Sequence, residues 1–145
     1  KLIIKHNDLK SIDSILDLSE AVFRPSPKEK ELYHNKQDWL QKINDNGLLL
    51  TALIDDNIAG YALCYPKGEG IHIWNVGVSS KYRRKGIWKE LYKTILTYAH
   101  EQKYPYITLN TYEDEFPNMY AFCQDNGFTR YKLENGKSYF RKKLT

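Results

Sequence analysis

The stretch NVGVSSKYRRKGIWKELYKTIL, residues 75–96, contains the most informative pattern in the chain. An apolar run that ends at Val78 passes into a turn, and a helical pattern follows the glycine at position 86. Six Lys and Arg residues and a single Glu lie between positions 81 and 93, which gives this segment a charge of +5. Because the net charge is +4, the rest of the chain sums to −1. The positive charge is concentrated at one strand-to-helix turn, which favours a compact anionic ligand over a broad nucleic-acid surface.

The composition is that of a globular protein. Of 145 residues, 41% are hydrophobic and 28% are charged, and we expect one domain over residues 1–145. No apolar run approaches the roughly 20 residues that span a bilayer, and no signal-peptide pattern opens the chain. Cys64 and Cys123 lie in apolar segments without metal-ligand spacing. They favour buried free thiols in a reducing compartment, with a disulfide left open as the alternative. The expected location is the cytoplasm, with no membrane association and no metal site.

Hydrophobic spacing predicts one mixed sheet with helices against it. Helices are expected over residues 7–23, about 29–46, 87–99 and 117–125. Strands are expected over residues 2–6, 48–55, 57–65, 71–78, 104–112, 128–133 and 137–144. The predicted fold class is α/β (α+β mixed), in the order β-α-α-β-β-β-α-β-α-β-β. We expect a central sheet of about seven strands, with helices on both faces.

The glycine at position 86 lies where a helix start would form a phosphate-binding site. The first N–H groups of a helix lack internal partners and lie at the positive end of the helix dipole, so they suit phosphate. Glycine also lets the main chain approach a ligand closely. The alternative is a solvated basic loop that happens to contain a glycine, and local composition does not choose between the two.

Two features together make the sequence resemble the GNAT superfamily of acyl-CoA-dependent N-acyltransferases. The family signature R/Q-x-x-G-x-G/A, which follows a V-x-V strand, is matched by residues 83–88, RRKGIW, after VGV. A second family element, a short helix that ends in GF, is matched by residues 119–128, MYAFCQDNGF. The order of predicted elements is also that of the family. The resemblance therefore covers nearly the whole chain and is most specific at these two motifs.

The resemblance implies a coenzyme site made of named residues. Backbone amides of residues 84–88 would hold the pyrophosphate of acetyl-CoA, and the preceding strand would pair with the pantetheine arm. Basic side chains of the turn would add charge toward phosphate. The implied cofactor-binding residues are Val76, Gly77, Val78, Arg83, Arg84, Lys85, Gly86, Ile87 and Trp88. The implied activity is acetyl transfer from acetyl-CoA to a primary amine by direct attack, and the acceptor is a small molecule or a protein.

The chain departs from the family pattern at two positions. Trp88 occupies a position that is normally small; its stripe with Tyr92 and Leu96 predicts an indole that leans on the core. Where many members carry a tyrosine that protonates the leaving thiolate, this chain has Cys123. Cys123 is expected to be either a core thiol or a weak proton donor, and Tyr120, nearly one helical turn earlier, offers a hydroxyl to the same region.

The general base and the acceptor pocket are less defined. His72 is a candidate base because its side chain titrates near neutrality, with a structural role as the alternative. The acidic residues at 113–115 either attract a cationic amine or are solvated loop charges. Aromatic residues are candidates for the acceptor pocket or for core and rim positions, and a homodimer is left open. These aromatics are Tyr33, Trp39, Tyr61, Tyr65, Trp74 and Tyr112.

Two other functions remain open at this stage. A degenerate family member would bind acyl-CoA without turnover, as a sensor or partner subunit, and the missing tyrosine favours it. A nucleic-acid-binding module would instead use the basic segment at 81–93 and would bind with steep salt dependence.

Overall fold

A seven-stranded mixed sheet with helices on both faces forms the molecule, seen in a computed structural model that describes residues 1–26 and 35–144. The strand order is β1-β2-β3-β4-β5-β7-β6, and every neighbouring pair is antiparallel except β4 and β5. The strands are β1 (Leu2–His6), β2 (Leu48–Ile54), β3 (Asn57–Lys67), β4 (Gly70–Val78), β5 (Tyr106–Tyr112), β6 (Thr129–Glu134) and β7 (Lys137–Lys143). The predicted fold class and element order are confirmed.

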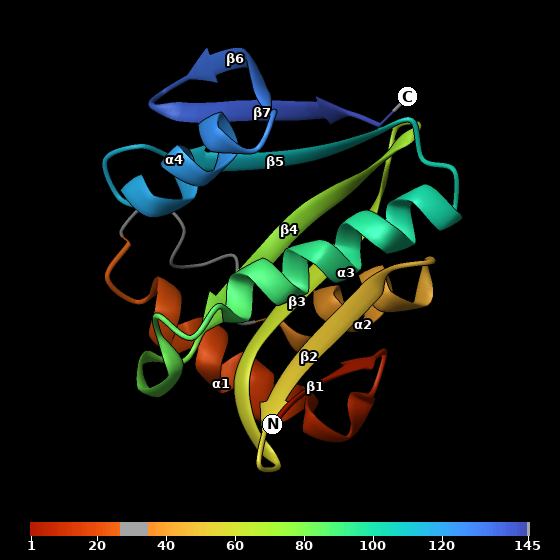
Figure 1. Ribbon diagram of the computed structural model, residues 1–145, viewed down its shortest axis with the longest axis vertical. Coiled ribbons are helices and arrows are strands. Elements are labelled where there is room, and N and C mark those ends of the chain that lie inside the picture. Colours follow the sequence, from red (N-terminus) through yellow and green to blue (C-terminus); the bar gives the residue numbers. More distant parts are fainter. Residues whose placement is uncertain (27–34, 145) are drawn as a thin grey trace.

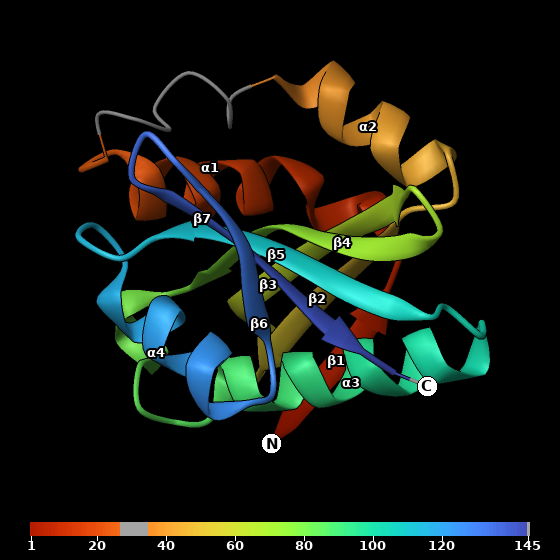
Figure 2. The same ribbon diagram turned by 90° about the horizontal axis from the view of Figure 1, so that it is seen from above.

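The helices cover the sheet in pairs. Helices α1 (Ile12–Phe23) and α2 (Lys36–Asn44) lie on one face, and α3 (Ile87–Glu101) and α4 (Pro117–Asp125) lie on the other (Figure 2). Short 3₁₀ turns, η1 (Leu9–Ser11) and η2 (Ser80–Tyr82), precede α1 and α3. Asp8 caps η1, because its side chain accepts a hydrogen bond from the N–H of Lys10.

Element boundaries differ from the expected ones for local reasons. Asn35 caps α2 through its side chain, and the helix ends at Asn44, two residues before the predicted end. The expected helical residues 29–34 lie outside the described part of the chain. Strand β5 begins at Tyr106 and not at 104, after Pro105, whose nitrogen has no hydrogen to donate to a ladder. Strands β3 and β4 meet in a turn at Gly68, which has a φ of +61° that suits glycine.

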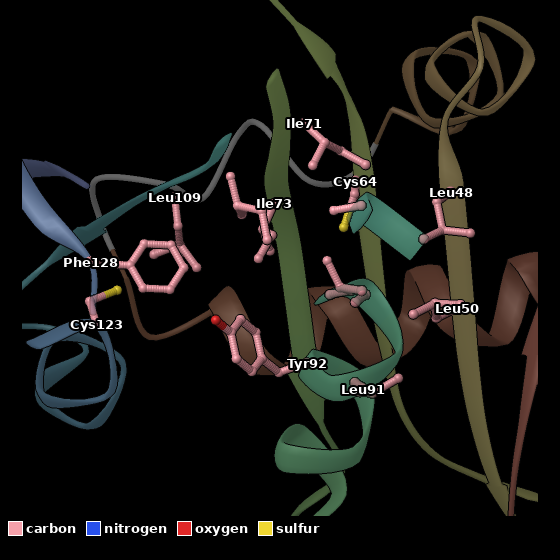
Figure 3. Close-up of a cluster of buried hydrophobic side chains, with 14 of the residues drawn as sticks. Leu48, Leu50, Cys64, Ile71, Ile73, Leu91, Tyr92, Leu109, Cys123 and Phe128 are labelled. Carbon is pink, nitrogen blue, oxygen red and sulfur yellow. The ribbon is translucent and has the colours of Figure 1, made fainter. Parts of the chain in front are cut away.

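Two apolar clusters fill the space between the sheet and its helices. The larger cluster lies between the sheet and α3, with α4 at one end (Figure 3). It includes Ile73 of β4, Leu91 of α3 and Leu109 of β5, all nearly inaccessible to solvent. The smaller cluster packs Ile12, Ile15, Trp39 and Ile43 from α1 and α2 onto the opposite face. Because both faces of the central strands are covered, these strands are almost continuously apolar.

Candidate functional site

The parallel strands β4 and β5 separate part-way along their length. They pair only from Ile71 with Ile107 to Ile73 with Leu109, and beyond this point neither strand pairs with the other. Residues 74–78 of β4 continue along β3, while β5 continues along β7 (Figure 1). The register of β3 against β4 also shifts here, so that Trp74 forms a bulge. Main-chain groups at the edges that face each other are thus available for a ligand.

An apolar cavity occupies this divergence. Its walls come from both strands, from the end of α1 and from the start of α4. Phe23 and Phe116 meet edge to face, with ring centroids 5.5 Å apart, and close one side. The lining residues include Val22, Phe23, Trp74, Val76, Asn110, Tyr112, Phe116 and Met119.

A second, more open groove of about 540 Å³ continues from the cavity to the start of α3. Val22, Val76 and Met119 line both spaces, so the two are adjacent. Of the nine predicted cofactor-binding residues, eight line this groove, and only Lys85 does not. Sequence reasoning missed the contributions of Asn118 and Met119 of α4, because they depend on how α4 packs across the sheet.

The turn before α3 has the backbone geometry of an anion site. Arg84 and Gly86 both have left-handed φ angles, +65° and +73°. No side chain caps the helix, and a Cβ added at Gly86 would meet nothing within 4 Å. The first N–H groups of α3 therefore open onto the groove without a competing cap. The side chains of Arg83 and Arg84 are exposed there, so the electrostatics favour a negatively charged group.

Trp88 leans onto the core, as its apolar stripe predicts. Its ring lies 5.2 Å from that of Phe122 and 5.8 Å from that of Tyr92, centroid to centroid. The indole therefore packs between α3 and α4, and Trp88 still lines the groove. Its Nε1 atom is buried and has no hydrogen-bond partner among the described residues.

Neither predicted proton donor lies at the divergence. Cys123 is fully buried in the larger apolar cluster beside Phe128, and burial raises the pKa of its thiol to about 12 (Figure 3). Tyr120 packs on Phe140 and accepts a hydrogen bond of 3.2 Å from Arg130 of β6. Its hydroxyl therefore faces the C-terminal hairpin. The apolar neighbours of Cys123 and the Arg130 partner of Tyr120 therefore do not favour a proton-donor role for either group, and for Cys123 they favour the core-thiol alternative.

The candidate base His72 occupies a buried position on β4. Its side chain is 3% exposed, and its Nδ1 lies 2.7 Å from Oγ1 of Thr108 on the neighbouring strand. Burial lowers the pKa of His72 to about 3, and positive charges of Lys67, Lys137 and Lys42 add to the effect. A buried imidazole that binds a proton so weakly is not suited to take one from an ammonium group. These contacts favour a structural role for His72 over a role as general base.

The acidic residues 113–115 and the aromatic residues predicted for the acceptor pocket do not lie together at one site. Glu115 accepts a hydrogen bond of 2.9 Å from Ser26, while residues 113 and 114 are exposed. Trp39 and Tyr61 are core residues, and Tyr65 meets His72 edge to face. Of the predicted aromatics, Trp74 and Tyr112 line the apolar cavity. Tyr33 lies outside the described residues.

Two kinds of feature are absent from residues 1–26 and 35–144. No helix there is long and apolar enough to cross a bilayer. No group of three or more His, Cys, Asp or Glu side chains in the same part of the chain is placed to hold a metal ion.

Comparison with known proteins agrees with this geometry. The family model described as Acetyltransferase (GNAT) family matches residues 12–128. A GNAT-family acetyltransferase from Staphylococcus aureus Mu50 is 18% identical, with 100% of both chains covered and a TM-score of 0.84. The PaiA N-acetyltransferase from Thermoplasma acidophilum, in complex with coenzyme A, is 14% identical, with 99% of both chains covered and a TM-score of 0.84. No curated protein matches the sequence.

A third solved structure carries the acetylated coenzyme. It is a GNAT-family acetyltransferase from Elizabethkingia anophelis with acetyl-CoA bound, and it is 19% identical. The alignment covers 99% of this chain and 98% of that one, with a TM-score of 0.72. At such identities, likeness to these structures concerns the fold, whereas the family match covers most of the sequence.

Proposed function

Because the chain belongs to the GNAT acetyltransferase family, we propose that it transfers an acetyl group from acetyl-CoA to a primary amine. One observation carries the proposal: the gap between β4 and β5 continues as a groove to the uncapped start of α3. The pantetheine arm would pair with the free edge of residues 74–78, and the diphosphate would lie over the turn at Arg84 and Gly86. The coenzyme-bound neighbours support this choice of donor.

The chemistry is a direct attack in a ternary complex. The amine nitrogen bonds to the thioester carbon, the carbon–sulfur bond breaks, the thiolate of coenzyme A gains a proton and the amine loses one. Covalent catalysis by cysteine is not supported, because Cys64 and Cys123 are both fully buried and burial raises the pKa of each thiol. Among residues 1–26 and 35–144, those that line the cavity include no His, Asp, Glu or Lys. Positioning, with carbonyl polarisation by N–H groups near residues 76–78, would supply most of the rate.

Ligand binding and turnover can be tested separately. Thermal shifts with acetyl-CoA, coenzyme A and ATP test the groove, and thiol release tests transfer. The acceptors would be n-butylamine, 2-phenylethylamine, alaninamide and a lysine-containing peptide. We expect acetyl-CoA to raise the melting temperature and at least one amine to release coenzyme A. Absence of any shift with acetyl-CoA would contradict the proposed site.

A matched glycine pair gives the control. Gly86→Asp places a carboxylate where the diphosphate would bind. An added Cβ meets nothing there, and the cost to the fold is the strain of a side chain at a φ of +73°. Gly136→Asp carries the same change at a left-handed φ of +81°, in the turn between β6 and β7. We expect Gly86→Asp to weaken acetyl-CoA binding at least tenfold and Gly136→Asp to leave it unchanged. Equal effects of the two would mean that the loss is only conformational.

The second candidate is an acyl-CoA sensor or partner subunit without turnover. The positions of Cys123 and Tyr120 favour it, since neither supplies an acid at the divergence. Thiolate of coenzyme A is a fair leaving group, so transfer does not require such an acid. Tight binding of acetyl-CoA without thiol release from any amine of the panel would identify the sensor.

The cellular location, the domain extent and the oligomeric state are also proposed. We propose a cytoplasmic protein, on the ground that Cys64 and Cys123 are free, buried thiols. We also propose that residues 1–145 form one domain. A homodimer is proposed from the exposed apolar side chains of Tyr131 and Leu133 on edge strand β6. Light scattering at micromolar concentration would test it, and a mass of about 17.1 kDa, that of one chain, would refute it.

A further inference from the structure

Asn110, in the middle of β5, carries a buried hydrogen-bond acceptor with no partner. Its Oδ1 atom is inaccessible to solvent and unpaired among the described residues. The flanking residues Leu109 and Thr111 are buried, and Asn110 is the single amide side chain of β5. A buried unpaired polar atom destabilises a fold, so one that persists in a native structure calls for an explanation such as a catalytic role, a water molecule or an ion.

The atom belongs to a residue that lines the apolar cavity at the divergence of β4 and β5. The pairing of β4 with β5 ends at Leu109, one residue before Asn110. The other walls of the cavity are mainly apolar or aromatic, including Val22, Phe23 and Met119. An acceptor oxygen among such walls is suited to fix the orientation of one N–H group rather than to attract charge from a distance.

The face of the sheet on which Asn110 lies determines whether its side chain meets the acetyl donor or the acceptor. Leu109 points into the cluster with α3, whereas Thr108, one residue earlier, bonds to His72. Side chains alternate along a strand, so Asn110 shares the Thr108 face, which is the face covered by α1 and α2 (Figure 2). Helix α3, whose N-cap is Gly86, lies on the opposite face (Figure 2). A donor held by the turn at Gly86 and an acceptor that enters from the α1 side would meet at the divergence.

We propose, resting on the proposed function, that Oδ1 of Asn110 accepts a hydrogen bond from the acceptor amine and so orients its lone pair toward the thioester carbon. The amide takes no proton in this role, so Asn110 binds and aligns the nucleophile without acting as a base. The amine that fits has an apolar group next to its nitrogen, because the surrounding walls are apolar and aromatic. We expect 2-phenylethylamine to be a better substrate than the lysine-containing peptide.

The test replaces Asn110 by leucine, which branches at the same carbon and has the same number of side-chain heavy atoms, is somewhat larger, and has no polar atom. With the fastest amine of the panel, Asn110→Leu should lower kcat/KM about 10- to 100-fold, the effect of one lost hydrogen bond in a buried site. Affinity for acetyl-CoA should stay within about twofold. The ligand-free variant should melt at the same or a higher temperature, because the unpaired oxygen has gone. Asn44→Leu, at an exposed asparagine of α2, is the matched control. It should leave kcat/KM and the affinity for acetyl-CoA unchanged.

Each other outcome is decisive. If kcat/KM of Asn110→Leu stays within twofold of wild type, the proposal fails while the proposed function stands. If acetyl-CoA affinity falls as much as kcat/KM, Oδ1 serves the pantetheine amide and the proposal is overturned. A lower melting temperature without ligand would identify a structural role instead. If the wild-type protein releases no coenzyme A with any amine, the proposed function and this inference fail together.

Discussion

Gly77 offers a sharp test of whether packing or ligand binding requires a small residue in β4. A Cβ added at Gly77 would lie 2.5 Å from Cε2 and 2.8 Å from the hydroxyl oxygen of Tyr61, its partner in the register with β3. Ordinary contacts begin near 3.4 Å, so the ring would have to move by about 0.9 Å. Tyr61 is fully buried and its hydroxyl lies 2.6 Å from Oδ1 of Asn75, so it has little freedom to move.

The magnitude follows from this clash. Forcing a methyl group into a packed core costs about 1–3 kcal/mol. For a domain of this size, such a loss lowers the melting temperature by about 2–12 °C. Replacement of a glycine by alanine in an unstrained site has the opposite sign, a gain of about 0.4–1 kcal/mol from the unfolded chain. A measured loss of unfolding free energy in Gly77→Ala would therefore come from the contact with Tyr61.

A double-mutant cycle assigns the effect. Urea unfolding of Gly77→Ala, Tyr61→Leu and the double variant should show that the double change costs at least about 1 kcal/mol less than the sum of the two. Tyr61→Phe keeps Cε2 and should relieve little of the clash. If Gly77→Ala is as stable as wild type but loses acetyl-CoA affinity, the glycine serves the ligand and the packing argument is refuted.

Two further predictions concern the residues that sequence reasoning had assigned to catalysis. Burial lowers the pKa of His72 to about 3, so its contribution to stability is full above the unfolded value near 6.5 and is lost as pH falls toward 3. The difference in unfolding free energy between wild type and His72→Gln should change with a slope of up to about 1.4 kcal/mol per pH unit in that window, measured by urea titration; parallel curves for the two proteins would contradict this. Cys123→Ala should leave turnover within twofold and cost about 1 kcal/mol of stability, and Tyr120→Phe should leave turnover unchanged. A tenfold fall in kcat for either variant would place its side chain at the reaction.

The elements could be predicted from the sequence because their signals are local. The apolar stripe of α3 ran through Trp88, and the packing of its indole against Tyr92 and Phe122 followed from it. The glycine turn was equally readable, because Gly86 and the basic residues beside it lie within one short segment. Eight of the nine predicted binding residues accordingly line one groove.

The positions of the polar side chains could not be predicted, because they depend on contacts between distant segments. Tyr120 is held by Arg130 of β6, and His72 by Thr108 of β5. Asn110 was missed because its surroundings exist only where β4 leaves β5. The one available signal was a single amide side chain within the predicted strand 104–112. Gly77 matched a ligand-binding motif, and its second role under the ring of Tyr61 appears only in the register of β3 with β4.

The early end of the β4–β5 ladder has a mechanical consequence. With three residue pairs as the only strand-to-strand link, β1–β4 and the unit of β5, β7 and β6 are two smaller sheets hinged at one end. A molecule lodged in the open end would bridge the two sheets and tie their motions together. Amide hydrogen exchange in β5 should therefore slow on saturation with coenzyme, even at residues far from the diphosphate turn.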